Sequence, residues 1–163
     1  MPREVLLSAI YPQPPRDVWR ALTDRDLLAQ WLMPNDFLPR VGHRFTFRTD
    51  PAPGFDGIVH CEVLELIAEQ KLTISWRGGG NDTVVTFTIE PVPTGTRLRL
   101  SHQGFAGIKG RLIGALLGNG WRNMLDKKLP RVLHGGGAGD VIGGCDQEAG
   151  LLWKTLNRVW GRS

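Results

Sequence analysis

The pattern of hydrophobic and polar residues predicts a strand over residues 3–11, followed by two short helices. Prolines at positions 12, 14 and 15 end the strand, because proline donates no hydrogen bond to a neighbouring strand. Pro15 suits the first turn of a helix, where a backbone N–H would have no partner. Thr23 can cap a second helix over residues 24–31, whose first turn carries two acidic residues.

From residue 43 onward, apolar and polar residues alternate with a period of two, which is typical of strands with one buried face. Short segments rich in glycine, proline and polar residues separate the strands and predict tight turns. Neighbouring strands joined by such turns form an antiparallel meander. The expected strands cover residues 44–48, 58–67, 72–76, 83–90 and 97–102.

Helical spacing returns after residue 105. One apolar stripe consists of Trp121, Met124, Leu125, Leu129, Val132 and Leu133. Pro130 lies within this stripe and predicts a kink near residues 126–130. The preceding segment, residues 108–117, is apolar but interrupted by glycine, so any helix there is weakened.

The end of the chain differs in composition from the rest. Seven glycines between residues 135 and 150 indicate a linker, and residues 151–163 contain an amphipathic tail helix. We therefore expect one domain over residues 1–134, a glycine-rich linker over 135–150 and a tail helix over 151–163. The tail helix can dock on its own domain, on a second copy or on a membrane surface.

Composition excludes several classes of protein. Of the 163 residues, 41% are hydrophobic and 22% charged, which excludes wholesale disorder. The two cysteines, Cys61 and Cys145, lack the spacing of a metal or redox site. We see neither a secretory signal nor an apolar stretch of the roughly 20 residues that span a bilayer. A cytoplasmic protein is therefore expected.

The net charge of +4 is concentrated in one region. Residues 97–134 carry eight basic residues and one acidic residue. Such a region can be a solvated face, or it can attract an anionic ligand, an acidic partner or a membrane surface. Nucleic-acid binding is not expected, because no recognition motif or aromatic–basic platform accompanies the charge.

The sequence carries no motif for metal, phosphate or acyl chemistry. The four histidines form no zinc motif, and the glycines at 78–80 precede a strand instead of the helix that a phosphate site needs. No serine lies in a Gly-x-Ser-x-Gly turn. We therefore expect no metal and no cofactor.

The order of elements predicts an α+β domain in which the late helix covers the apolar face of a curved antiparallel sheet. If the side chains between sheet and helix are too few, an internal pocket remains. The residues expected to face that pocket are apolar or amphipathic and lie on inner faces: Trp31, Phe37, Phe45, His60, Trp76, Phe87, His102, Trp121, Met124 and Leu125.

The two histidines of that set, His60 and His102, are assigned to apolar strand faces by the alternation around them. Each can be a hydrogen-bonded core residue, a ligand contact or a general acid–base group. Glu62 shares the alternation of His60 and is a candidate carboxylate for the pocket or for the sheet edge.

Several segments together carry a resemblance to a known family. They include PPRDVWRALTD at residues 14–24, LAQWLMP at 28–34, VGHRF at 41–45, LTISW at 72–76, GTRL at 95–98 and SHQGF at 101–105. In order and spacing, over about residues 3–134, they resemble the START-like (SRPBCC) superfamily. Within it they resemble the family named for the activator of the heat-shock protein 90 ATPase. The linker and tail helix depart from the usual family length.

The resemblance implies the helix-grip fold, in which a sheet grips a long C-terminal helix around an apolar pocket. That superfamily includes lipid and sterol carriers, aromatic cyclases and chaperone-associated domains, so the fold alone does not settle the function. We expect binding of a small hydrophobic or amphipathic ligand in an internal cavity, without catalysis. A chaperone-associated protein-interaction module and a cyclase- or hydrolase-like enzyme are the alternatives, and a homodimer remains open.

Overall fold

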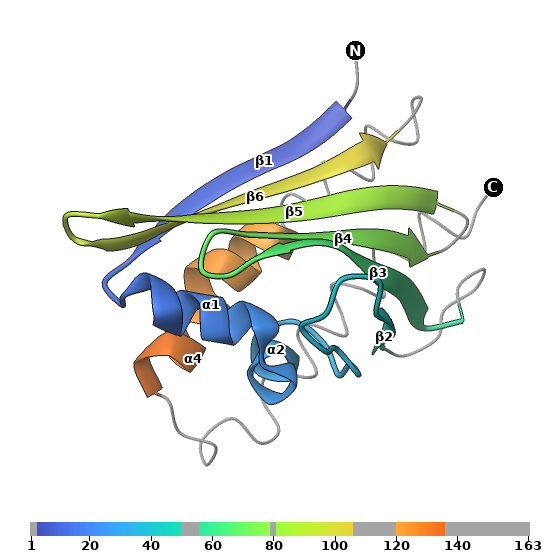
Figure 1. Cartoon of the computed structure of the whole chain (residues 1–163), viewed down its shortest axis with the longest axis horizontal. Coiled ribbons are helices and arrows are strands. Elements are labelled where there is room, and N and C mark those ends of the chain that lie inside the picture. The colour runs from blue at the N-terminus through green and yellow to red at the C-terminus, as the bar shows by residue number, and fades with distance from the viewer. Residues whose placement is uncertain (1–2, 50–55, 79–80, 106–119, 136–163) are drawn as a thin grey trace.

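A computed structural model describes residues 3–49, 56–78, 81–105 and 120–135 of the chain (Figure 1). The sheet has six strands in the order β1-β6-β5-β4-β3-β2, and every neighbouring pair is antiparallel. In chain order the elements are β1 (Arg3–Tyr11), α1 (Pro15–Thr23), α2 (Arg25–Trp31), β2 (Arg44–Arg48), β3 (Ile58–Ile67), β4 (Lys71–Gly78), β5 (Asn81–Val92), β6 (Gly95–Phe105), the π-helix η1 (Met124–Lys128) and α4 (Leu129–Gly135).

The helices lie together on one face of the curved sheet (Figure 1). Strands β2 to β6 form the predicted meander, and β1 joins the far side by pairing with β6, where Leu7 lies opposite Leu100. The α+β class and the helix-grip arrangement are therefore confirmed. Alternate residues of each strand point toward the helices, and in β2 and β4 these residues are mostly apolar and buried. The inner face of the sheet is therefore apolar.

The first helices begin close to where the sequence predicts. Pro15 occupies the first turn of α1, as expected. The cap of α2 is Asp24 and not Thr23: one Asp24 carboxylate oxygen accepts hydrogen bonds from two backbone N–H groups of the first turn, at 2.9 and 3.1 Å. The Thr23 hydroxyl instead donates to the carbonyl of Trp19, one turn back in α1. A carboxylate at this position also favours the positive end of the helix dipole.

The helical segment over residues 120–135 contains the irregularity that Pro130 predicts, in the form of a π-helical turn. The N–H of Leu129 donates to the carbonyl of Met124, one residue further back than in an α-helix. Pro130 has no N–H, so the carbonyl of Leu125 lacks the donor that would come from residue 129 or 130. The buried hydroxyl of Tyr11 in β1 donates to that carbonyl at 2.6 Å.

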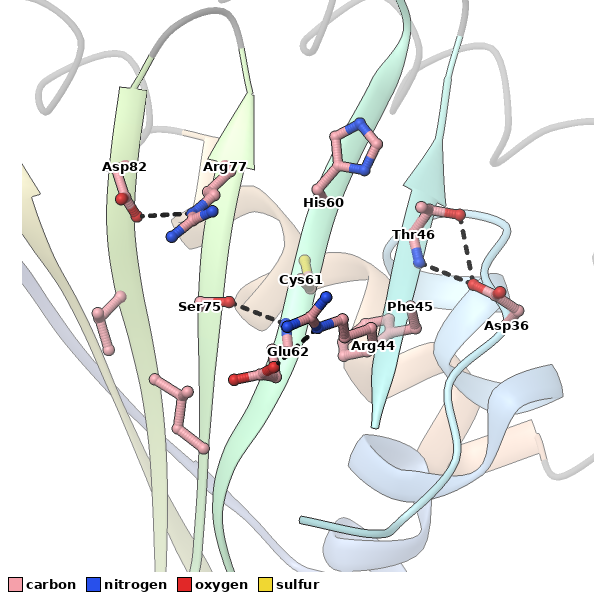
Figure 2. A pocket seen from close by; sticks show the side chains of 12 residues that line it. Asp36, Arg44, Phe45, Thr46, His60, Cys61, Glu62, Ser75, Arg77 and Asp82 are labelled. Carbon is pink, nitrogen blue, oxygen red and sulfur yellow. Dashed lines mark hydrogen bonds and ion pairs between the residues drawn. The ribbon is translucent and has the colours of Figure 1, made fainter. Parts of the chain in front are cut away.

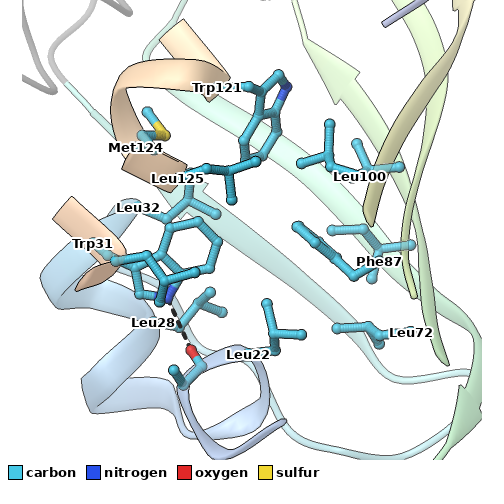
Figure 3. Packing of buried hydrophobic residues seen from close by; sticks show 14 of the residues in the cluster. Leu22, Leu28, Trp31, Leu32, Leu72, Phe87, Leu100, Trp121, Met124 and Leu125 are labelled. Atoms are coloured by element: carbon cyan, nitrogen blue, oxygen red, sulfur yellow. Dashed lines mark hydrogen bonds between the residues drawn. The ribbon is translucent and has the colours of Figure 1, made fainter. Parts of the chain in front are cut away.

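The hydrophobic core lies between the sheet and the helices. Figure 3 shows the side chains of α1 and α2 meeting those of β4, β5 and β6, with Leu125 and Trp121 above them. The indole Nε1 of Trp31 donates to the carbonyl of Ala21 at 2.9 Å, which ties α2 to α1. The burial of such large apolar groups supplies most of the driving force for folding.

Three predicted segments lie outside the described residues: the weakened helix at 108–117, most of the linker at 135–150 and the tail helix at 151–163. The proposed division into domain, linker and tail therefore stays a prediction. In the part of the chain that the structure describes, no helix is long and apolar enough to cross a membrane.

Candidate functional site

An unbroken row of aromatic rings lines the inner face of the sheet. Phe37 contacts Phe45 with ring centroids 5.1 Å apart, and Phe45 contacts Phe47 at 5.3 Å. Phe47 in turn lies 5.3 Å from Trp76. The first two contacts are edge-to-face, an arrangement that the charge distribution of aromatic rings favours.

The row continues from the sheet to the helices. Trp76 lies 5.7 Å from Trp121 at the start of the helical segment, and Trp121 lies 6.0 Å from Phe87. Phe87 then contacts Trp31 of α2 at 6.3 Å. The rings therefore connect β2, β4 and β5 with α2 and with the helical segment over residues 120–135. We call these seven residues the aromatic wall: Trp31, Phe37, Phe45, Phe47, Trp76, Phe87 and Trp121.

Nine of the ten residues predicted to face a pocket share this interior. None of the nine is more than 3% exposed. Sequence reasoning omitted Phe47, although Phe47 lies two residues after Phe45 on the same strand and therefore on the same face. The nine buried residues are Trp31, Phe37, Phe45, Trp76, Phe87, His102, Trp121, Met124 and Leu125.

The tenth residue, His60, was assigned to the wrong face. It is exposed on the outer face of β3, because its neighbours Val59 and Cys61 are the residues that point into the core. The prediction grouped His60 with Leu64, which is itself 43% exposed. Apolar residues occupy both alternating sets of positions along this strand, so the pattern alone does not decide which set is buried. A β-bulge between Val63 and Glu65 lies beyond His60 and does not change its face.

His102 is fully buried at the junction of sheet and helix, and both ring nitrogens are engaged. The indole Nε1 of Trp121 donates to Nδ1 of His102 at 3.2 Å, so Nδ1 carries no proton. The proton of the neutral ring then lies on Nε2, which is 2.8 Å from the Thr83 hydroxyl. That hydroxyl donates to the backbone carbonyl of Trp76 at 2.9 Å.

The surroundings of His102 keep its ring neutral. Burial lowers the pKa of His102 to about 3, because a charged imidazolium would lose its hydration. A group with so low a pKa does not act as a proton donor near neutral pH. Of the three roles weighed for His102, the geometry supports the hydrogen-bonded core histidine.

The opposite, outer face of the sheet carries a cavity of about 750 Å³ (Figure 2). Two ion pairs lie across it: Arg44 with Glu62 at 3.1 Å and Arg77 with Asp82 at 3.3 Å. His60 lies on β3 two residues before Glu62, opposite Arg77 in the pairing of β3 with β4. The lining comprises Asp36, Arg44, Phe45, Thr46, His60, Cys61, Glu62, Leu64, Ser75, Arg77, Asp82 and Val84.

The charges of this outer cavity nearly cancel. Its two arginines face three carboxylates, so it presents no strong field of one sign. Asp36 accepts a hydrogen bond from the Thr46 backbone N–H at 2.7 Å, which lowers the pKa of Asp36 and anchors its loop to β2. Sequence reasoning placed Glu62 on the same face as His60 correctly and had named Phe45, but it missed the other lining residues, because solvent-facing strand residues carry no motif.

The described residues meet the requirements of neither a nucleophilic thiol nor a metal site. Burial raises the pKa of the Cys61 thiol, which disfavours the thiolate needed for nucleophilic chemistry. Among the described residues, no three His, Cys, Asp or Glu side chains are placed to hold a metal ion.

Comparison with known proteins agrees with this architecture. No curated protein matches the chain. Protein MLL2253 from Mesorhizobium loti is 36% identical with a TM-score of 0.72, covering 81% of this chain and 97% of its own. CalU16 from Micromonospora echinospora is 25% identical with a TM-score of 0.64, covering 96% of this chain and 89% of its own.

BH1534 from Bacillus halodurans shares the fold at 23% identity and a TM-score of 0.67, covering 80% of this chain and 96% of its own. Residues 12–134 match the family described as activator of Hsp90 ATPase homolog 1-like protein. With three quarters of its length matched and the helix-grip fold in place, the chain belongs to this family of the START-like superfamily.

Proposed function

We propose that this protein binds a small hydrophobic or amphipathic ligand against the aromatic wall, without catalysing a reaction. The observation that carries the proposal is the continuity of the wall, in which seven buried rings contact one another in an unbroken row between the sheet and the helices. Ligand sites in proteins are mostly apolar and aromatic, with a few placed polar groups. Membership of a family whose members often bind hydrophobic ligands supports the same reading.

The chain of hydrogen bonds through His102 has a structural part in this proposal. It holds the Trp121 indole by its Nε1, while the rest of the ring remains in the apolar interior. Orienting a wall residue in this way favours a preformed site over one that rearranges on binding. It also engages both nitrogens of His102, which supports binding over proton transfer.

Binding is tested with the full chain by native mass spectrometry and by tryptophan fluorescence. The probes are a fatty acid, a sterol and a polycyclic aromatic compound, each titrated separately. We expect at least one probe to add its mass and to quench the buried tryptophans. Phe87→Leu, which shortens the wall between Trp31 and Trp121, should weaken that binding about tenfold.

The matched control is Leu64→Ala, which trims the lining of the outer cavity and leaves the wall intact. This variant should bind the probe as the unaltered protein does. Loss of binding in Leu64→Ala but not in Phe87→Leu would place the ligand on the outer face and contradict the proposal. No binding of any probe would also contradict it.

The chaperone-associated alternative draws on the family description and on the basic region 97–134. In the described part of that region, Arg97 and Arg99 both contact Glu90, at 3.0 and 3.2 Å. These contacts reduce the positive charge that the two side chains offer to an acidic partner. The described residues therefore favour ligand binding over this alternative.

A further inference from the structure

The two edges of the sheet are protected to different degrees. Strand β2, at one edge, is five residues long and carries an exposed arginine at each end, Arg44 and Arg48. A bridge between Asn35 and Phe47 also covers part of it. Charges, short length and covering segments are the usual means of keeping an edge strand from pairing with another chain.

Strand β1, at the other edge, lacks these protections in the part of the chain that the structure describes. It is nine residues long, and residues 5–11 contain no charge, no proline and no glycine. Its register irregularity lies at its beginning, between Arg3 and Glu4. The carboxylate of Glu4 is held within its own sheet by the side chains of Ser101 and Gln103.

The outer face of β1 also exposes apolar side chains. Leu6 is 68% exposed and Ile10 is 53% exposed, and both lie on the side of the strand away from the core. Ser8, between them, is exposed as well. An uncharged edge strand with exposed apolar residues is a template for pairing with another strand.

We propose that β1 pairs antiparallel with β1 of a second copy, joining the two sheets about a twofold axis at Ser8. In this register Leu6 of each copy lies opposite Ile10 of the other, and Ser8 lies opposite itself. Residues 5–11 then pair wholly with uncharged residues. Each copy thus covers the exposed apolar pair of the other, as an interface between identical surfaces requires.

Other registers are less favourable. Shifting the axis by one residue to Leu7 places Leu6 opposite Ser8 and places Glu4 opposite Ile10 of the second copy. Shifting it to Leu6 leaves Ile10 beyond the partner strand. The register centred on Ser8 therefore pairs all four exposed apolar side chains of the dimer with one another, and this self-complementarity selects a second copy over an unrelated peptide.

Sedimentation velocity of the full chain over a range of concentrations measures the association. We expect a reversible monomer–dimer equilibrium. Ser8→Lys places two like charges side by side at the axis and should raise the dissociation constant of the dimer at least about tenfold. Val41→Lys is the matched control: Val41 is 59% exposed in a loop away from β1, and its substitution should leave association unchanged.

A cross-link tests the register directly. In a background where Cys145 is replaced by serine, Ser8→Cys should give a covalent dimer with mild oxidation or a short thiol cross-linker, because directly opposed side chains lie about 5 Å apart. Leu6→Cys in the same background should cross-link much less. A protein that is monomeric at every concentration, a dimer unaffected by Ser8→Lys, or equal cross-linking of both cysteine variants would each overturn the proposal.

Discussion

The hydrogen bond between Tyr11 and Leu125 offers a sharp test of how Pro130 is accommodated. The change Tyr11→Phe removes one hydroxyl and keeps the aromatic ring, which is buried at the end of β1. The hydroxyl donates to the Leu125 carbonyl at 2.6 Å. When the hydroxyl is removed, the buried Leu125 carbonyl loses the donor that takes the place of the N–H groups of residues 129 and 130.

The expected cost follows from these contacts. A buried polar group that loses its partner costs about 1–3 kcal/mol, whereas removal of a hydroxyl that water can replace costs little. We expect Tyr11→Phe to lower the free energy of unfolding by about 2 kcal/mol. Thr73→Val is the matched control, because its half-buried hydroxyl makes only a 3.4 Å contact with Thr86. It should cost less than about 0.5 kcal/mol.

Urea denaturation followed by tryptophan fluorescence measures both variants, and a double-mutant cycle with Pro130→Ala tests the cause. Alanine restores an N–H at residue 130, so the Leu125 carbonyl regains a possible donor. In that background Tyr11→Phe should cost about 1 kcal/mol less than in the unaltered protein. A loss below about 0.5 kcal/mol, or equal losses in both backgrounds, would refute the argument.

Alkaline pH tests the burial of the same hydroxyl group. Burial, with a smaller contribution from Asp126, raises the pKa of Tyr11 above its usual value of 10. Because the pKa of Tyr11 is higher in the folded than in the unfolded chain, the stability that the protonated hydroxyl contributes is complete below pH 10. That stability is lost as the pH rises further. The unaltered protein should therefore lose stability above pH 10 more steeply than Tyr11→Phe.

Three further predictions concern His102, Asp24 and Gly95. Because burial lowers the pKa of His102 to about 3 from 6.5, the unfolded chain binds one more proton between these values, so stability should fall with decreasing pH by up to about 1.4 kcal/mol per unit. Urea denaturation from about pH 7.5 to 5 should show that slope in the unaltered protein and a smaller one in His102→Phe; parallel profiles would contradict it. Asp24→Ala removes the cap of α2 and should cost about 1 kcal/mol by urea denaturation, and an unchanged midpoint would count against the cap. Gly95→Ala should cost more than about 2 kcal/mol, because φ is +145° and an added Cβ would lie 2.0 Å from the Tyr11 carbonyl oxygen; an unchanged thermal midpoint would rule this out.

For the described residues, the sequence by itself was sufficient to predict the helices and strands and most of the side chains on the inner face of the sheet. Alternation over residues 44–48 and 72–76 placed Phe45 and Trp76 inside, since a strand exposes its two faces with a strict period of two. Pro15 and Pro130 act through their own backbone, so a helix start and a helical irregularity could be predicted locally. The family resemblance supplied the helix-grip arrangement of these pieces.

Tertiary structure decided what depends on contacts between distant segments. His60 faces outward because Val59, Cys61 and Val63, at the alternate positions of β3, are the residues that pack into the core. The burial that keeps His102 neutral, and its contacts with Trp121 and Thr83, arise only in the folded chain. The donor for Leu125 lies 114 residues away in Tyr11. Periodicity reports a residue's own backbone, whereas protonation and hydrogen-bond partners depend on what the fold brings alongside it.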